Sequence, residues 1–126
     1  YCYATGDVHA SSNSGGLTGS GEGTCTVTEC YSVGFVDCGG DSTCGALAGV
    51  SDSGGFPAVT ASFWNKETSG FLTSFGGGEG RTTSELKQKA TFTAAGWDFV
   101  DEWSTWLIDE GLSYPYFRFT TYPWYP

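Results

Sequence analysis

The sequence predicts an all-β fold: a short right-handed parallel β-solenoid of about two to three coils, with an aromatic-rich C-terminal cap that contains one short helix. Three observations predict it: an internal repeat, a glycine-rich first half that holds all five cysteines, and an aromatic-rich second half. Repeats with periods of roughly 20–50 residues are typical of solenoids, propellers and arrays. Glycines at the corners and short β-type segments favour parallel β-coils over helical repeats.

The repeat is visible in two sequence elements. Residues 2–8 (CYATGDV) return as residues 30–36 (CYSVGFV), and residues 15–19 (GGLTG) return as residues 45–49 (GALAG). A third, diverged copy begins at Ser62. Equivalent residues of stacked repeats lie beside one another, because each repeat contacts its neighbours. We therefore expect one ladder of Tyr3, Tyr31 and Phe63, and another of Leu17 and Leu47.

Composition changes sharply near residue 62. Residues 1–62 hold 5 of the 21 aromatic residues, and the remaining 16, with all five tryptophans, follow. The first half must therefore be stabilised by backbone stacking, small side chains and disulfides. We expect solenoid repeats over residues 1–62, a capping unit packed on the solenoid over residues 63–117, and an aromatic tail over residues 118–126.

Local patterns predict the elements of the second half. The glycine-rich residues 76–80 predict a flexible loop. Thr82 and Glu85 form a capping box that opens a short helix through Lys89. Residues 97–99 alternate as in a strand, and residues 114–119 are a second strand candidate.

These segments resemble the GLUG-type repeats of bacterial surface adhesins and some secreted peptidases. The GGLTG and CYATGDV elements carry the repeat-like part, and residues 62–70 (SFWNKETSG) resemble the segment that ends such arrays. Residues 82–87, 95–99 and 110–116 continue the resemblance, which covers nearly the whole chain. It implies an extracellular β-solenoid with a C-terminal cap and no chemistry of its own. The five cysteines and the short length depart from the family's pattern.

Charge and hydropathy exclude two classes of partner. The net charge of −9 should repel phosphate backbones and anionic lipid, so no nucleic-acid partner is expected. The longest apolar run, about residues 46–50, is far shorter than the roughly 20 residues of a membrane-spanning helix. Five cysteines in a small acidic chain indicate an oxidising compartment. We therefore expect an extracellular or cell-surface location.

The cysteine positions suggest two disulfides. Cys2 and Cys30 occupy the same repeat position, and the ~4.8 Å spacing of stacked strands lies within the ~4.4–6.8 Å Cα separation of a disulfide. If these two pair, Cys38 and Cys44 close the loop between them and Cys25 is left unpaired or available to another molecule. Pairing of Cys25 with Cys30 is the competing local alternative.

The histidine, the cysteines and the isolated aspartates give only weak indications of a catalytic or metal site. His9, the one histidine, follows Asp7 at the spacing of an oriented base, but an exposed loop histidine is the simpler interpretation. The cysteine spacings do not match those of zinc ligands, and calcium binding by Asp37, Asp41 and Asp52 lacks a complete loop pattern. We predict no metal site and no cofactor.

A group of acids near three tryptophans is the best catalytic candidate, because paired carboxylates hydrolyse glycosidic bonds. The acids are Asp98, Asp101, Glu102, Asp109 and Glu110, and the tryptophans are Trp97, Trp103 and Trp106. They fall in the cap-like segment, where solvated acids beside buried tryptophans explain the pattern. We predict no catalytic residue.

The leading hypothesis is a non-catalytic extracellular structural or adhesion protein that assembles as a surface or filament subunit. We expect no cap before the first coil, and we expect the aromatic tail to pair with the open sheet edge of another copy, giving head-to-tail assembly. The candidate residues are Tyr1, Phe117, Phe119, Tyr122, Trp124 and Tyr125. One alternative is a carbohydrate-binding module that uses exposed Trp and Tyr, with surface glycans as partners. A small polysaccharide-active enzyme is the other.

Overall fold

The computed structural model describes residues 1–21, 25–99 and 104–118. The chain divides into two compact units, Tyr1–Thr82 and Thr83–Pro126. Secondary structure in the described residues is mostly strand, with parallel sheets in the first unit and one short α-helix in the second. No helix in these ranges is long and apolar enough to cross a membrane.

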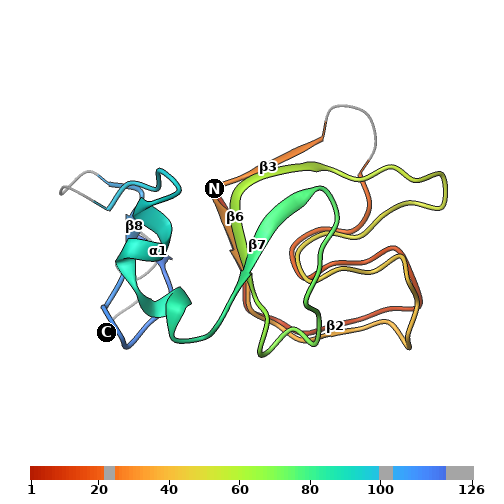
Figure 1. The fold of residues 1–126 in the computed structure, drawn as a ribbon, viewed down its shortest axis with the longest axis horizontal. Helices are drawn as coiled ribbons and strands as arrows, with labels where there is room; N and C mark the ends of the chain where they lie inside the picture. The colour runs from red at the N-terminus through yellow and green to blue at the C-terminus, as the bar shows by residue number, and fades with distance from the viewer. Residues whose placement is uncertain (22–24, 100–103, 119–126) are drawn as a thin grey trace. The chain divides into compact units, whose positions relative to one another are not determined.

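The main sheet of the first unit is parallel and is built from successive passes of the chain. Strand β1 (Cys2–Ala4) pairs with β4 (Cys30–Ser32), and β4 pairs with the second part of β6 (Ala58–Asn65). Strand β3 (Thr26–Thr28) pairs with the first part of β6. Figure 1 shows the first two passes, in red and orange, following nearly the same path.

The register of this sheet agrees with the predicted repeat. Tyr3 pairs with Tyr31, and Tyr31 pairs with Phe63, which gives the expected aromatic ladder. The rings of Tyr3 and Tyr31 stack with centroids 5.2 Å apart and planes inclined by 6°. The ladder forms because each strand presents the same face of the repeat to the next strand.

A second parallel ladder runs along another side of the same unit. Strand β2 (Val8–His9) pairs with β5 (Val36–Asp37), again at the predicted offset. Isolated bridges join Gly15 to Gly45 and Thr18 to Ala48. The N–H of Leu17 donates to the carbonyl of Leu47 at 3.0 Å, so the expected leucine ladder is also present.

The core of the first unit combines small, aliphatic and aromatic side chains that the passes bring together. Its main cluster consists of Ala46, Leu47, Ala48, Val59 and Trp64, against which Leu17, Val27 and Phe71 pack. Backbones approach closely around it. A Cβ built on Gly34 would lie 1.9 Å from the carbonyl oxygen of Gly6 in the pass before, so only glycine fits there.

The glycine-rich segment predicted to be a flexible loop is instead strand β7 (Gly77–Arg81), parallel to β6. Its glycines permit a contact that side chains would prevent. A Cβ on Gly76 would lie 1.8 Å from the Pro57 carbonyl oxygen, and one on Gly80 would lie 2.9 Å from Nε1 of Trp64. The glycines therefore specify close packing here, which composition alone does not distinguish from flexibility.

The compositional break at residue 62 is not the boundary between the two units. Strand β6 crosses this position, and its two parts pair with β3 and β4 of the preceding pass. The first unit continues through β7 to Thr82. Aromatic residues such as Phe63 and Trp64 therefore belong to the stacked sheet.

The second unit contains a 3-10 helix, η1 (Glu85–Lys87), helix α1 (Lys89–Thr93) and the antiparallel pair β8 (Trp106–Leu107) and β9 (Tyr116–Phe117). The predicted helix is thus split in two. The N-cap residues of the two helices are Ser84 and Gln88, and neither of these two side chains makes a capping hydrogen bond.

Residues 97–99 form no strand, contrary to the prediction. Their aromatic side chains pack inward, with Trp97 4.7 Å from Phe92 and 4.5 Å from Trp106 between ring centroids. The alternation of Trp97 and Phe99 thus reflects packing in an aromatic core. The second predicted strand is present but short, as β9.

Candidate functional site

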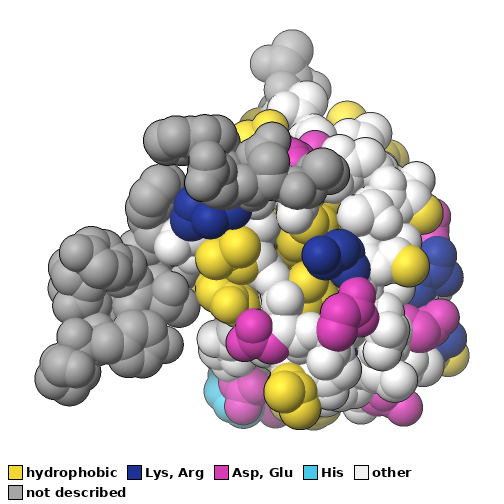
Figure 2. Space-filling view, turned by 90° about the vertical axis from the view of Figure 1, so that its left-hand side faces the viewer, with side chains coloured by type: hydrophobic (Ala, Val, Ile, Leu, Met, Phe, Trp, Pro, Cys, Tyr) yellow, Lys and Arg dark blue, Asp and Glu magenta, His cyan; other side chains and the backbone are white. Residues whose placement is uncertain are grey.

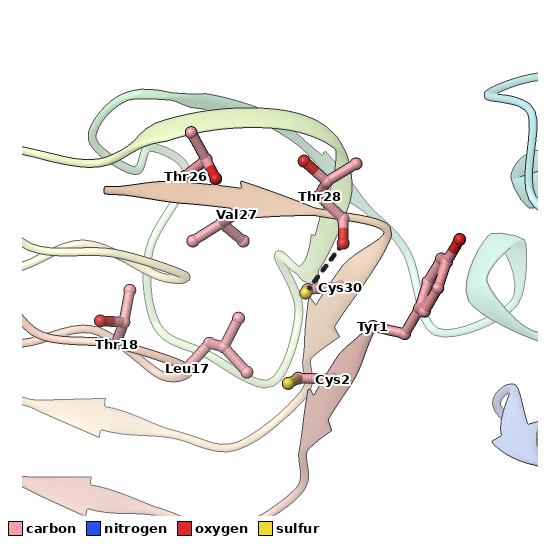
Figure 3. Close-up of a pocket in the computed structure, with 8 residues that line it drawn as sticks. All are labelled: Tyr1, Cys2, Leu17, Thr18, Thr26, Val27, Thr28 and Cys30. Carbon is pink, nitrogen blue, oxygen red and sulfur yellow. Dashed lines mark hydrogen bonds between the residues drawn. The ribbon is translucent and has the colours of Figure 1, made fainter. Parts of the chain in front are cut away.

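A pocket of about 440 Å³ opens in the first unit beside strand β3 (Figure 3). Residues of β1, β3, β4 and the first-pass turn line it. They are Tyr1, Cys2, Leu17, Thr18, Thr26, Val27, Thr28 and Cys30. The walls are apolar at Leu17 and Val27, which also pack on the main core cluster, and carry hydroxyl and thiol groups elsewhere.

The pocket lies beside a sheet edge. In the described sheet, β3 has β6 as its neighbour on one side and no strand on the other. The N–H of Ala58 in β6 donates to the Cys25 carbonyl at 3.0 Å. Because successive residues of a strand direct their backbone groups to opposite edges, those of Thr26 and Thr28 face away from β6. This edge carries no charged side chain.

Two thiols face this pocket side by side. Cys2 and Cys30 are directly opposite in the register of β1 and β4, and Figure 3 shows both sulfur atoms on the pocket side of the sheet. Cys2 is exposed, whereas Cys30 is 5% exposed. The Cys30 thiol donates to the carbonyl of Thr28 at 3.2 Å. Burial raises the pKa of the Cys30 thiol above its usual value, so the group favours the neutral form.

The predicted disulfide between Cys2 and Cys30 is not formed, since both are free thiols in the structure. In-register residues of neighbouring parallel strands point the same way. Their Cβ atoms therefore stay near the ~4.8 Å strand spacing, whereas a disulfide needs a Cβ separation of ~3.5–4.5 Å. The Cα separation of Cys2 and Cys30 allows a disulfide, but their parallel side chains keep the Cβ atoms too far apart, so both thiols stay free.

The disulfide between Cys38 and Cys44 is present, with a Cα separation of 6.5 Å. Inside its loop the Asp41 carboxylate accepts hydrogen bonds from the hydroxyl and, at 2.8 Å, the N–H of Thr43. These two bonds hold the pKa of Asp41 below its usual value. Cys25 is exposed and free, so the alternative pairing of Cys25 with Cys30 is also absent.

His9 has the exposed position that the simpler interpretation gave it. Its Nδ1 lies 3.5 Å from the carboxylate of Asp37, and both side chains are more than half exposed. Asp7 is engaged elsewhere, because its Oδ1 accepts the N–H of Phe35 at 2.9 Å. Asp7 therefore does not orient the imidazole.

The acids of the second unit make local structural contacts. Glu110 accepts the N–H of Lys89 at 2.9 Å, at the start of α1. Asp109 accepts the hydroxyl of Tyr116 at 3.3 Å. Asp98 is exposed, while Asp101, Glu102 and Trp103 lie outside the described residues. The described acids therefore contribute to loop and helix structure.

The three candidate calcium ligands are likewise occupied by hydrogen bonds. Asp37 accepts the Gly39 N–H, Asp41 binds Thr43, and Asp52 accepts the Asn13 amide. Within the described ranges no three His, Cys, Asp or Glu residues are grouped as metal ligands. Figure 2 shows acidic side chains scattered among neutral ones on the face in view.

The aromatic candidates divide into buried, exposed and undescribed residues. Trp64, Trp97 and Trp106 are at most 5% exposed, so none of these three can stack on a sugar. Tyr1 is 66% exposed beside the pocket. Phe117 packs on Trp106 with ring centroids 4.5 Å apart. The remaining self-association candidates, Phe119, Tyr122, Trp124 and Tyr125, lie outside the described residues.

A protein of known sequence is similar to most of this chain. No family model matches the chain, and no solved structure matches it. A protein of Evansella cellulosilytica named "Putative Gly-rich membrane protein" is 36% identical over 107 residues. The match covers 81% of this chain and 11% of that protein, so the chain spans a small part of the curated relative's length.

This comparison corrects one expectation. We expected an extracellular or cell-surface location from the sequence. This expectation is wrong, because the similar protein is named as a membrane protein. The expectation rested on the cysteine content and on the resemblance to GLUG-type repeats. In the structure three of the five cysteines are free thiols, so the pattern indicates an oxidising compartment less strongly than the count suggested.

Proposed function

We propose that this chain is a non-catalytic structural module, and that its first unit is a short right-handed parallel β-solenoid of the GLUG-repeat type. Three passes with equivalent residues in register support the proposal, including the Tyr3, Tyr31 and Phe63 ladder. In a solenoid each coil is stabilised by its neighbours, so an end coil is an attachment point for more of the same structure. The Evansella match, a small part of a longer protein, is consistent with a modular unit.

The module associates with a second copy of itself through the open edge of β3. This edge is the observation that carries the proposal: β3 has a strand on one side, and the pocket lies beside its other side. Natural proteins protect such edges with charges, prolines or covering segments, because unpaired backbone groups template pairing with another chain. The Thr-Val-Thr sequence of β3 has neither charge nor proline.

The segment that adds to this edge is residues 119–126 of the second copy. Its sequence, FTTYPWYP, contains no ionisable acid or base among Asp, Glu, Lys, Arg and His, so pairing with β3 brings no like charges together. Its aromatic and threonine residues favour strands, and prolines are tolerated where a strand has one bonded edge. Main-chain hydrogen bonds then provide affinity, and the pocket accepts an aromatic side chain.

The experiment is sedimentation velocity of the full chain over a range of concentrations at physiological salt, which screens the net charge of −9. Thr26→Pro removes an N–H that faces away from β6, so association should weaken by at least roughly tenfold. Thr26→Val keeps the N–H and is the matched control, with unchanged association. Deletion of residues 119–126 should give a folded monomer. A monomeric full chain at high concentration, or equal association of the Pro and Val variants, would refute the proposal.

A further inference from the structure

The two free thiols of the pocket lie side by side on neighbouring strands. Cys2 and Cys30 occupy the same register position on β1 and β4, and both sulfur atoms point toward Leu17 and Val27 (Figure 3). Neighbouring strands of a sheet lie ~4.8 Å apart, and in-register side chains are parallel. Parallel side chains keep the Cβ atoms near this spacing, which is longer than the ~3.5–4.5 Å Cβ separation of a disulfide.

A slight lean of the two side chains toward each other, by a few tenths of an ångström from the ~4.8 Å strand spacing, places both sulfur atoms within reach of one metal ion. With metal–sulfur bonds of about 2.3 Å, the value for zinc thiolates, two sulfur atoms on opposite sides of an ion lie at most about 4.6 Å apart. Soft thiolates favour Cu(I), Zn and iron–sulfur clusters. Structural zinc requires four ligands, and the described residues contain no group of three or more metal-ligating side chains. A soft d¹⁰ cation that accepts two ligands in a line, Cu(I), is the best match.

We propose that Cys2 and Cys30 bind one Cu(I) ion in two-coordinate geometry, bridging β1 and β4. Binding replaces the two thiol protons, which go to solvent, and forms two Cu–S bonds with no change in oxidation state. The ion enters from the exposed Cys2 side and ends against the buried Cys30. Leu17 and Val27 form an apolar wall that shields the bridge from water. The site does not depend on self-association.

The test is anaerobic titration of the reduced full chain with Cu(I) in competition with a chromophoric Cu(I) chelator. We expect one tightly bound ion per chain. Cys2→Ser should weaken Cu(I) binding by roughly 10²–10⁴-fold. This is the increase in affinity expected when the same folded chain holds both ligands at a high effective concentration. Cys30→Ser should have the same effect. Cys25→Ser is the matched control, because Cys25 is a free, exposed thiol outside the pocket, and should bind as the unaltered chain does.

A second measurement keeps the proposal testable if a variant folds poorly. Alkylation of the unaltered chain followed by peptide mass spectrometry should find Cys2 protected by one equivalent of Cu(I) while Cys25 remains reactive. Equal protection of Cys2 and Cys25, or Cu(I) affinity that survives Cys2→Ser, would overturn the proposal. So would an equal loss of affinity in Cys25→Ser.

Discussion

Gly34→Ala tests whether direct contact between successive passes stabilises the first unit. The added Cβ would lie 1.9 Å from the carbonyl oxygen of Gly6 and 2.6 Å from its carbonyl carbon. The first distance is about 1.6 Å shorter than the ~3.5 Å at which non-bonded atoms rest. Relief therefore requires the two passes to separate by about a third of the ~4.8 Å strand spacing.

The expected cost follows from the contacts around Gly34. Overpacking a rigid site costs about 1–3 kcal/mol. Separation also weakens two bonds between the passes: Val33 N–H to Ala4 at 3.0 Å and Phe35 N–H to Asp7 at 2.9 Å. At about 0.5–1.5 kcal/mol each, the free energy of unfolding should fall by about 2–6 kcal/mol in total.

The measurement is urea unfolding followed by far-UV circular dichroism, with the alkylation rate of buried Cys30 as a second probe of the first unit. Gly6→Ala is the matched control, because Gly6 occupies the same repeat position and nothing lies within 4 Å of its added Cβ. That variant should be neutral, or more stable by about 0.4–1 kcal/mol. If the two variants unfold within about 0.5 kcal/mol of each other, the reasoning is wrong.

Two further predictions concern the core and the disulfide loop. Leu47→Ala should lower the free energy of unfolding by about 2–5 kcal/mol in the same urea assay, because Leu47 is 0% exposed, whereas Leu72→Ala, at a position 78% exposed, should change it little. In an NMR titration, Asp41 should show a pKa below the usual carboxyl value, and Thr43→Val should raise it. Since the folded-state pKa is depressed, this contribution to stability is present above the usual carboxyl pKa and is lost as the pH falls through the folded value. An unaltered pKa in Thr43→Val would show that this hydroxyl is not the cause.

Sequence reasoning succeeded where the repeat is regular. The return of Cys-Tyr after 28 residues gave the register of Tyr3 with Tyr31, and the return of the glycine-leucine element gave that of Gly15 with Gly45. Both follow because identical positions of stacked passes must share one hydrogen-bond ladder. The third pass is diverged, and the sequence marked it only by a short element that begins at Ser62 and includes Phe63.

Other features needed distances and directions that a repeat does not contain. The glycine-rich residues 76–80 look like a loop until Pro57 and Trp64 are found against Gly76 and Gly80. The Cys2 and Cys30 pair met the Cα criterion for a disulfide, but the parallel direction of the side chains decides against it. Strand β3 and its open edge were missed, although the alternation in Thr26-Val27-Thr28 was a usable signal.

The stacked tyrosines give the first unit an intrinsic spectroscopic label. Tyr3 and Tyr31 hold two phenol chromophores 5.2 Å apart and nearly parallel, and the two belong to different passes of the chain. Near-ultraviolet circular dichroism depends on such fixed aromatic packing and is lost when packing loosens. The contribution of this pair to the tyrosine band therefore reports on the contact between the first two passes, close to the thiol pair.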